Sequence, residues 1–117
     1  MKLQEIVESL SLTVRAGHGS LDSEVTGGYA ADLLSCAMAG AGKGALWVTL
    51  QGHLNVVAIA SLNELAGVIV TEGKPVAPDA LARADQERVP ILTTALSTFE
   101  VVGRLWELGV RAEEPQS

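Results

Sequence analysis

Four short, almost continuously apolar runs at a constant spacing constrain the fold of this chain more than any other feature. Their central residues, Val25, Trp47, Ile69 and Ile91, lie 22 residues apart. A strand, a helix and two short loops together use about that many residues. Because the runs are apolar throughout rather than alternating, they are typical of parallel strands covered by helices on both faces. The spacing therefore predicts successive strand–helix units in an α/β three-layer sandwich.

The predicted sheet is mostly parallel and has four to five strands. The four main strands are expected at Glu24–Thr26, Ala45–Leu50, Gly67–Thr71 and Val89–Thr93, and a shorter fifth strand is expected at Ser11–Val14. Apart from the strand pattern and one threonine, nothing recurs in each 22-residue unit. A solenoid of sequence repeats is therefore not favoured.

Local signals place helices around these strands. Asp32 is expected to cap the second helix, which should end at Gly40-Ala41-Gly42. A pair of Asp79 and Arg83, four residues apart, is expected on the fourth helix. The segment Ser97-Thr98-Phe99-Glu100 has the pattern of a capping box. The expected helices are Leu3–Leu10, Leu33–Ala39, Asn55–Leu65, Pro78–Arg88 and one from Ser97 to Gly109.

Length and composition fit one domain over residues 1–117, with a flexible tail over 113–117. A chain of 117 residues is long enough to bury one core. With 48% hydrophobic and 19% charged residues, the composition disfavours disorder. The net charge of −6 disfavours a nucleic acid as partner, because such binding needs a basic face.

The sequence also indicates the cellular compartment. The longest apolar stretches, such as Val56–Ala60, are far shorter than the ~18 residues that a membrane span needs. The start, from Met1 to Glu5, has an early acid and lacks the apolar segment of a secretory signal. We therefore expect a cytoplasmic protein with no membrane partner.

No motif gives a specific catalytic signal. Gly40-Ala41-Gly42-Lys43-Gly44 lacks the first glycine and the hydroxyl of a P-loop, and it follows a helix rather than a strand. His18 and His53 lie 35 residues apart without an acid cluster, which is not metal-ligand spacing. Cys36, the only cysteine, is expected as a buried filler rather than a nucleophile. We therefore expect no enzymatic activity, no catalytic residue, no metal site and no cofactor.

A candidate ligand site lies at the expected carboxyl ends of the strands, where open α/β sheets bind ligands. Two interpretations stay open at each place. Gly27 and Gly28 can bring backbone N–H groups to an anion or form a tight turn. His53 or Asn55 can contact a ligand or cap the following helix. The candidate ligand-binding residues are Thr26, Gly27, Gly28, Gln51, His53, Asn55 and Thr71.

A series of threonines reinforces this hypothesis. Thr26, Thr49, Thr71 and Thr93-Thr94 are expected at or near the carboxyl ends of four successive strands. Hydroxyl groups that converge there can bind a phosphate or a sugar. Threonine is also simply a good strand residue, and a hydroxyl often starts the turn that follows a strand.

One segment of the chain resembles the signature of DRTGG domains. It reads Leu21-Asp22-Ser23-Glu24-Val25-Thr26-Gly27-Gly28-Tyr29-Ala30-Ala31-Asp32-Leu33-Leu34-Ser35. The resemblance continues through 47–55, 67–73 and 97–105 and covers residues 20–109. The sequence departs from the family pattern in three places. The Asp-Arg pair of the Asp-Arg-Thr-Gly-Gly string is not reproduced before Thr26, Cys36 replaces an acid, and Leu54 replaces a proline.

This resemblance implies an α/β domain similar to the N-terminal domain of HPr kinase/phosphorylase. It implies a non-enzymatic regulatory or scaffolding module that forms a homodimer or binds another protein, and it carries over no catalytic residue. An apolar surplus in a small domain agrees with a subunit interface. Two alternatives stay open: a sensor of a nucleotide or another small anion at the candidate site, and a weak hydrolase or transferase that uses His53 as base.

Overall fold

Five strands form one sheet in the computed structural model, which describes residues 1–112. The strands are β1 (Thr13–Ala16), β2 (Gly27–Ala30), β3 (Ala45–Thr49), β4 (Gly67–Val70) and β5 (Ile91–Thr93). Their order across the sheet is β1-β5-β4-β3-β2. Only the β1–β5 pair is antiparallel. The predicted, mostly parallel α/β sheet is therefore confirmed.

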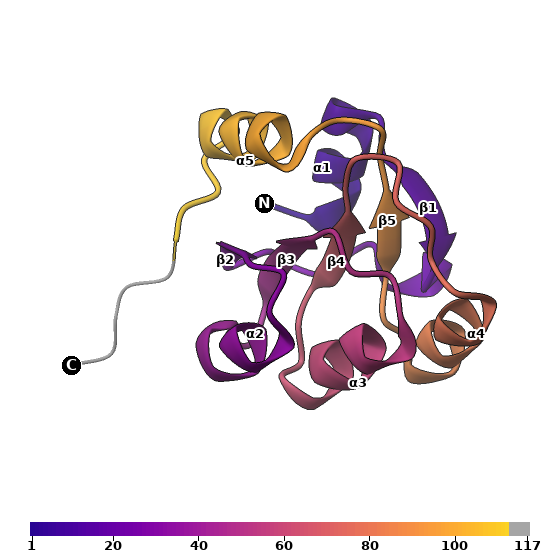
Figure 1. Ribbon diagram of the computed structural model, residues 1–117. Helices are drawn as coiled ribbons and strands as arrows, with labels where there is room; N and C mark the ends of the chain where they lie inside the picture. Colours follow the sequence, from indigo (N-terminus) through magenta and orange to yellow (C-terminus); the bar gives the residue numbers. More distant parts are fainter. Residues whose placement is uncertain (113–117) are drawn as a thin grey trace.

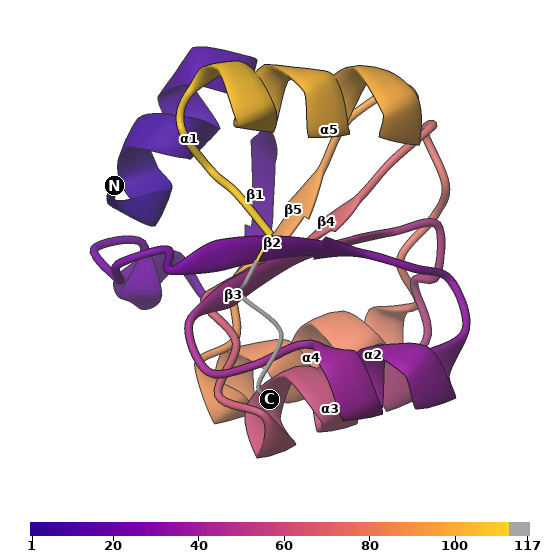
Figure 2. The same ribbon diagram turned by 90° about the vertical axis from the view of Figure 1, so that its left-hand side faces the viewer.

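Helices cover both faces of the sheet (Figure 1). In Figure 2, α1 and α5 lie above the sheet, and α2, α3 and α4 lie below it. A short 3-10 turn over His18–Ser20 follows β1. The helices are α1 (Leu3–Leu10), α2 (Leu34–Gly40), α3 (Leu54–Leu62), α4 (Pro78–Glu87) and α5 (Thr98–Glu107).

The strand β3 is buried on both of its faces. Trp47 packs in the cluster that includes residues of α3 and α4, whereas Leu46 and Val48 pack in the cluster that includes residues of α1 and α5. All four residues of β4 are buried as well. A strand covered on both sides has no polar face, which explains why these runs are continuously apolar.

The strand β2 begins later than the sequence predicts. A strand was expected at Glu24–Thr26, whereas β2 spans Gly27–Ala30. Glycine is rare in strands, but it allows another chain segment to approach closely. A Cβ atom on Gly28 would lie 3.3 Å from Cγ1 of Val110, and the Gly28 N–H donates to the carbonyl of Arg111. The segment after α5 therefore packs along β2, and glycine fits this contact.

The predicted cap on the second helix is wrong. The N-cap of α2 is Leu33, so Asp32 lies one residue too early to cap it. The Asp32 carboxylate instead accepts hydrogen bonds from the Leu50 N–H at 2.7 Å and from the Thr49 hydroxyl at 3.2 Å. Asp32 therefore links the segment before α2 to the end of β3 through hydrogen bonds.

Two other predicted polar contacts have different outcomes. Arg83 pairs with Glu87 at 2.9 Å rather than with Asp79. Both carboxylates lie four residues from Arg83, so their spacing alone does not decide between them. Ser97 is the N-cap of α5 and accepts from the Glu100 N–H at 3.1 Å, which confirms the predicted start of this helix.

Cys36 is exposed rather than buried, because α2 directs Ala37 toward the core instead.

Within residues 1–112, no helix is both long and apolar enough to cross a membrane. The predicted tail at 113–117 lies outside the described residues.

Candidate functional site

The predicted site residues lie on two different edges of the sheet. Because β2 starts at Gly27, Thr26 precedes this strand and lies at the amino edge. Its hydroxyl donates to the carbonyl of Lys43 at 2.9 Å. The expected position of Thr26 at a carboxyl end is therefore wrong. Gly27 and Gly28 belong to β2 itself, and neither has the positive φ that a tight glycine turn needs.

Gln51, His53 and Asn55 follow β3 at the carboxyl edge, as predicted. His53 is the N-cap residue of α3, but its side chain makes no capping hydrogen bond. Within residues 1–112, we find no hydrogen-bond partner for the His53 ring. No described residue therefore orients the His53 ring to act as a general base.

The interior of the carboxyl edge beside β3 is tightly packed. The gap between Gln51, His53 and α3 cannot hold a water molecule. The carbonyl of Gly52 accepts from the Ala77 N–H at 2.8 Å. A Cβ atom on Gly52 would lie 2.1 Å from the carbonyl oxygen of Pro75. The loop after β3 therefore packs directly on the loop before α4 and closes this part of the edge.

Thr49 and Thr71 are fully buried, and their hydroxyls are paired inside the fold. The Thr49 hydroxyl accepts from the Gln51 N–H at 3.1 Å, in addition to its bond with Asp32. The Thr71 and Thr98 hydroxyl oxygens lie 2.6 Å apart. Among the described residues, no buried side-chain nitrogen or oxygen lacks a partner. These threonines therefore join β3, β4 and α5 to one another.

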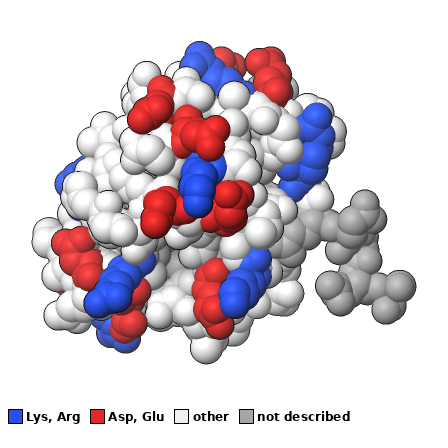
Figure 3. Space-filling view, turned by 180° about the vertical axis from the view of Figure 1, so that it is seen from behind, with Lys and Arg blue, Asp and Glu red and all other residues white. Residues whose placement is uncertain are grey.

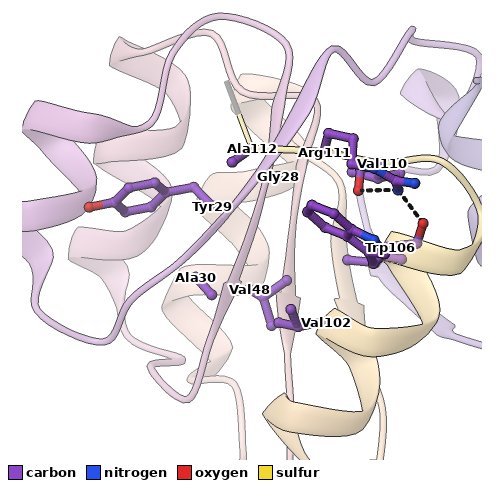
Figure 4. Close-up of a pocket in the computed structure, with 10 residues that line it drawn as sticks. Gly28, Tyr29, Ala30, Val48, Val102, Trp106, Val110, Arg111 and Ala112 are labelled. Atoms are coloured by element: carbon purple, nitrogen blue, oxygen red, sulfur yellow. Dashed lines mark hydrogen bonds between the residues drawn. The ribbon is translucent and has the colours of Figure 1, made fainter. Parts of the chain in front are cut away.

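A pocket of about 210 Å³ lies between the edge of β2 and α5 (Figure 4). Its strand side is formed by Gly28, Tyr29 and Ala30, and its helix side includes Val102 and Trp106. The lining is mostly apolar. Gly28 is the residue of the predicted site that lines this pocket.

Arg111 lies at the rim of this pocket, against the exposed Trp106. Its guanidinium carbon is 4.0 Å from the centre of the Trp106 ring, which is a cation–π contact. The guanidinium also donates to the carbonyls of Trp106 and Val110. The sequence contains one signal for this pocket. The apolar face of α5 is wider than the stripe that packs on the sheet, because Val102 and Trp106 lie beside that stripe.

The remaining electrostatic features lie outside the pocket. The Met1 ammonium group donates to Glu24 at 3.0 Å, and this bond lowers the pKa of the Glu24 carboxyl below its usual value. Residues 1–112 contain no group of three or more His, Cys, Asp or Glu side chains that could hold a metal ion.

The sequence model of the DRTGG domain matches residues 5–108 of the 117 residues. The chain belongs to the DRTGG domain family. This finding confirms the resemblance seen in the motifs. No curated protein matches the sequence.

Among solved structures, this DRTGG domain is similar to the CBS and DRTGG domains of the regulatory region of a Clostridium perfringens pyrophosphatase. That protein was crystallised with its activator, diadenosine tetraphosphate. The TM-score is 0.64 at 13% sequence identity, so the likeness concerns the fold alone. It covers 87% of this chain and 44% of the other, so this chain spans less than half of its neighbour.

The closed carboxyl edge of this DRTGG domain predicts that Gly52→Ala is destabilising. The new methyl group would lie 2.1 Å from a backbone oxygen, so one of the two loops must shift. We expect the free energy of unfolding to fall by about 2–3 kcal/mol, measured by urea denaturation. The control is Gly19→Ala, where nothing lies within 4 Å of the added methyl. Equal stability of the two variants would contradict the closed edge.

Proposed function

We propose that this DRTGG domain is a non-enzymatic regulatory or scaffolding module that works as a homodimer. The observation that carries the proposal is the set of large apolar side chains left on the surface. Phe99 is 89% exposed, Leu62 71%, Leu33 64% and Trp106 55%. Large exposed apolar patches on small domains mark interaction sites. A second subunit that packs on α5 would remove Phe99 and Trp106 from water, whereas Leu62 lies on α3, on the opposite side of the sheet (Figure 2).

The regulatory part of the proposal is supported by the comparisons. The family is shown by the sequence match, and the similar structure comes from the regulatory region of an enzyme. The described residues also give the hydrolase or transferase alternative no support, because the His53 ring has no partner among them. The geometry therefore favours a role in binding over a role in catalysis.

The molar mass in solution tests the homodimer. We expect light scattering coupled to size-exclusion chromatography to give twice the 12.2 kDa of one chain at micromolar concentrations. Burial of exposed aromatic side chains supplies the driving force for this association. A mass of one chain throughout that concentration range would contradict the proposal.

A second candidate function is the sensing of a nucleotide or another small anion. Support comes from the pocket beside Gly28, where Trp106 offers an aromatic face and Arg111 a positive charge. The similar structure contains a nucleotide activator. The other predicted ligand residues define alternative positions: Thr26 and Gly27 at the amino edge, and Gln51, His53 and Asn55 at the carboxyl edge, where Thr71 is buried and does not reach the surface.

Thermal unfolding with diadenosine tetraphosphate, ATP and inorganic phosphate tests this second function. A ligand at a hundred times its dissociation constant should stabilise the protein by ~2.7 kcal/mol. If the site is the pocket, the response should persist in His53→Ala, whereas loss in that variant would assign the ligand to the carboxyl edge. No response to any of the three compounds would count against sensing of these ligands.

A further inference from the structure

We propose that two copies of this chain dock through one face, with the α5 helices crossing antiparallel at Gly103. We call it the α5–β2 face and define it by Phe99, Val102, Gly103 and Trp106 of α5 and Ala30 of β2. The inference rests on the proposed homodimer and names its interface. Each copy would insert Phe99 into the pocket of the other.

The helix α5 has two apolar sides. Val101 and Leu105 are buried in the core, whereas Phe99, Val102 and Trp106 are exposed. The exposed residues lie three and four positions apart, so they form one stripe along the helix. Two of them, Val102 and Trp106, also line the pocket beside β2 (Figure 4). The stripe is therefore continuous with the edge of the sheet.

Contacts within one copy of the chain do not explain why residue 103 is a glycine. It lies in the middle of α5, where glycine is less favourable than alanine. Its φ is not positive, and apart from its chain neighbours and the backbone of α5 itself, no described atom lies within 4 Å of where its Cβ would be. No close neighbour within the described chain requires a glycine here. A missing side chain next to an apolar stripe lets the backbone of a second helix approach closely.

The pocket and Phe99 fit each other in size and position. Phe99 projects into solvent with 89% of its surface exposed. The pocket holds about 210 Å³, and a cavity of ~150 Å³ is enough for a benzene ring. In an antiparallel crossing at Gly103, Phe99 lies four residues before the crossing and Trp106 three residues after it. A two-fold axis therefore brings Phe99 of each copy next to the pocket of the other.

The exposed aromatic side chains of α5 supply the apolar centre of a subunit interface but only part of its area. Aromatic side chains of this size bury 150–250 Å² each, so Phe99 and Trp106 together offer on the order of 300 Å² of apolar surface. A stable interface buries about 800 Å² on each partner, with an apolar centre and a polar rim. The two aromatic rings supply such a centre, and the surrounding residues of α5 and β2 supply the rim.

The charge of this face favours a second copy as the occupant. The chain carries a net charge of −6, so two copies repel each other except where their faces are balanced. Around the stripe, Glu100 and Glu107 are matched by Arg104 and Arg111, and β2 has no charged residue. Arg104 and Glu100 already pair at 3.0 Å. Among the described residues, the charges of the α5–β2 face therefore balance on an acidic protein.

The view from behind shows a different kind of surface (Figure 3). There, several Lys and Arg side chains lie next to Asp and Glu side chains in groups scattered among uncharged residues. Such a surface would have to lose the hydration of many charges on association. It is therefore a poorer interface between two like copies than the α5–β2 face.

Sedimentation equilibrium of the full chain and three variants tests this interface. We expect Phe99→Glu to raise the dimer dissociation constant by at least about 30-fold, because it places a charge in the apolar pocket. Gly103→Leu should also weaken the dimer, while raising the thermal stability of the monomer through its helix propensity. The matched control is Leu62→Glu on α3, which is similarly exposed and should leave the dimer intact.

The outcomes separate this inference from the proposed homodimer. A wild-type dimer that resists both α5 variants, or that is broken by Leu62→Glu, overturns the interface and leaves the homodimer standing. A wild-type chain that stays monomeric overturns both. The emission of Trp106, which is exposed in one copy, should shift to shorter wavelength as the dimer forms, and an unchanged spectrum would also contradict the interface.

Discussion

The burial of β3 and β4 between two layers of helices is the constraint on which the rest of this structure depends. Both strands are buried along their whole length, so helices must cover both faces of the sheet. This covering brings the loops at the carboxyl edge into contact, with Gly52 pressed against Pro75. Inside the fold, the buried Thr49 hydroxyl bonds to Asp32 and the buried Thr71 hydroxyl bonds to Thr98. The covering ends at β2, the outermost strand on that side.

The central sheet was predictable because its signal is local and repeated. A constant spacing of apolar runs reports the length of a strand–helix unit, and the Ala45–Thr49 and Gly67–Val70 strands lie within the predicted runs. The strand β2 was not predictable in this way. Its Gly28 fits a contact with Val110 and Arg111, more than 80 residues away in the chain, and no local pattern reports such a contact.

The candidate site illustrates the same limit. Polar residues after β3 were correctly placed at the carboxyl edge, but whether loops leave a cavity there depends on how they pack on each other. The contact between Gly52 and Pro75 closes that space. The open pocket forms where α5 extends beside β2, and its lining residues look like ordinary core positions in the sequence. Their exposure becomes visible only in the fold.

An exposed Phe99, a mid-helix Gly103 and a pocket of suitable size all lie on the α5–β2 face, and the proposed second copy would account for all three. The most direct test is a disulfide across the proposed two-fold axis, with Gly103→Cys in a Cys36→Ser background. The account predicts rapid formation of a covalent dimer under mild oxidation. A yield no greater than that of a control cysteine at Leu62 in the same background would contradict it.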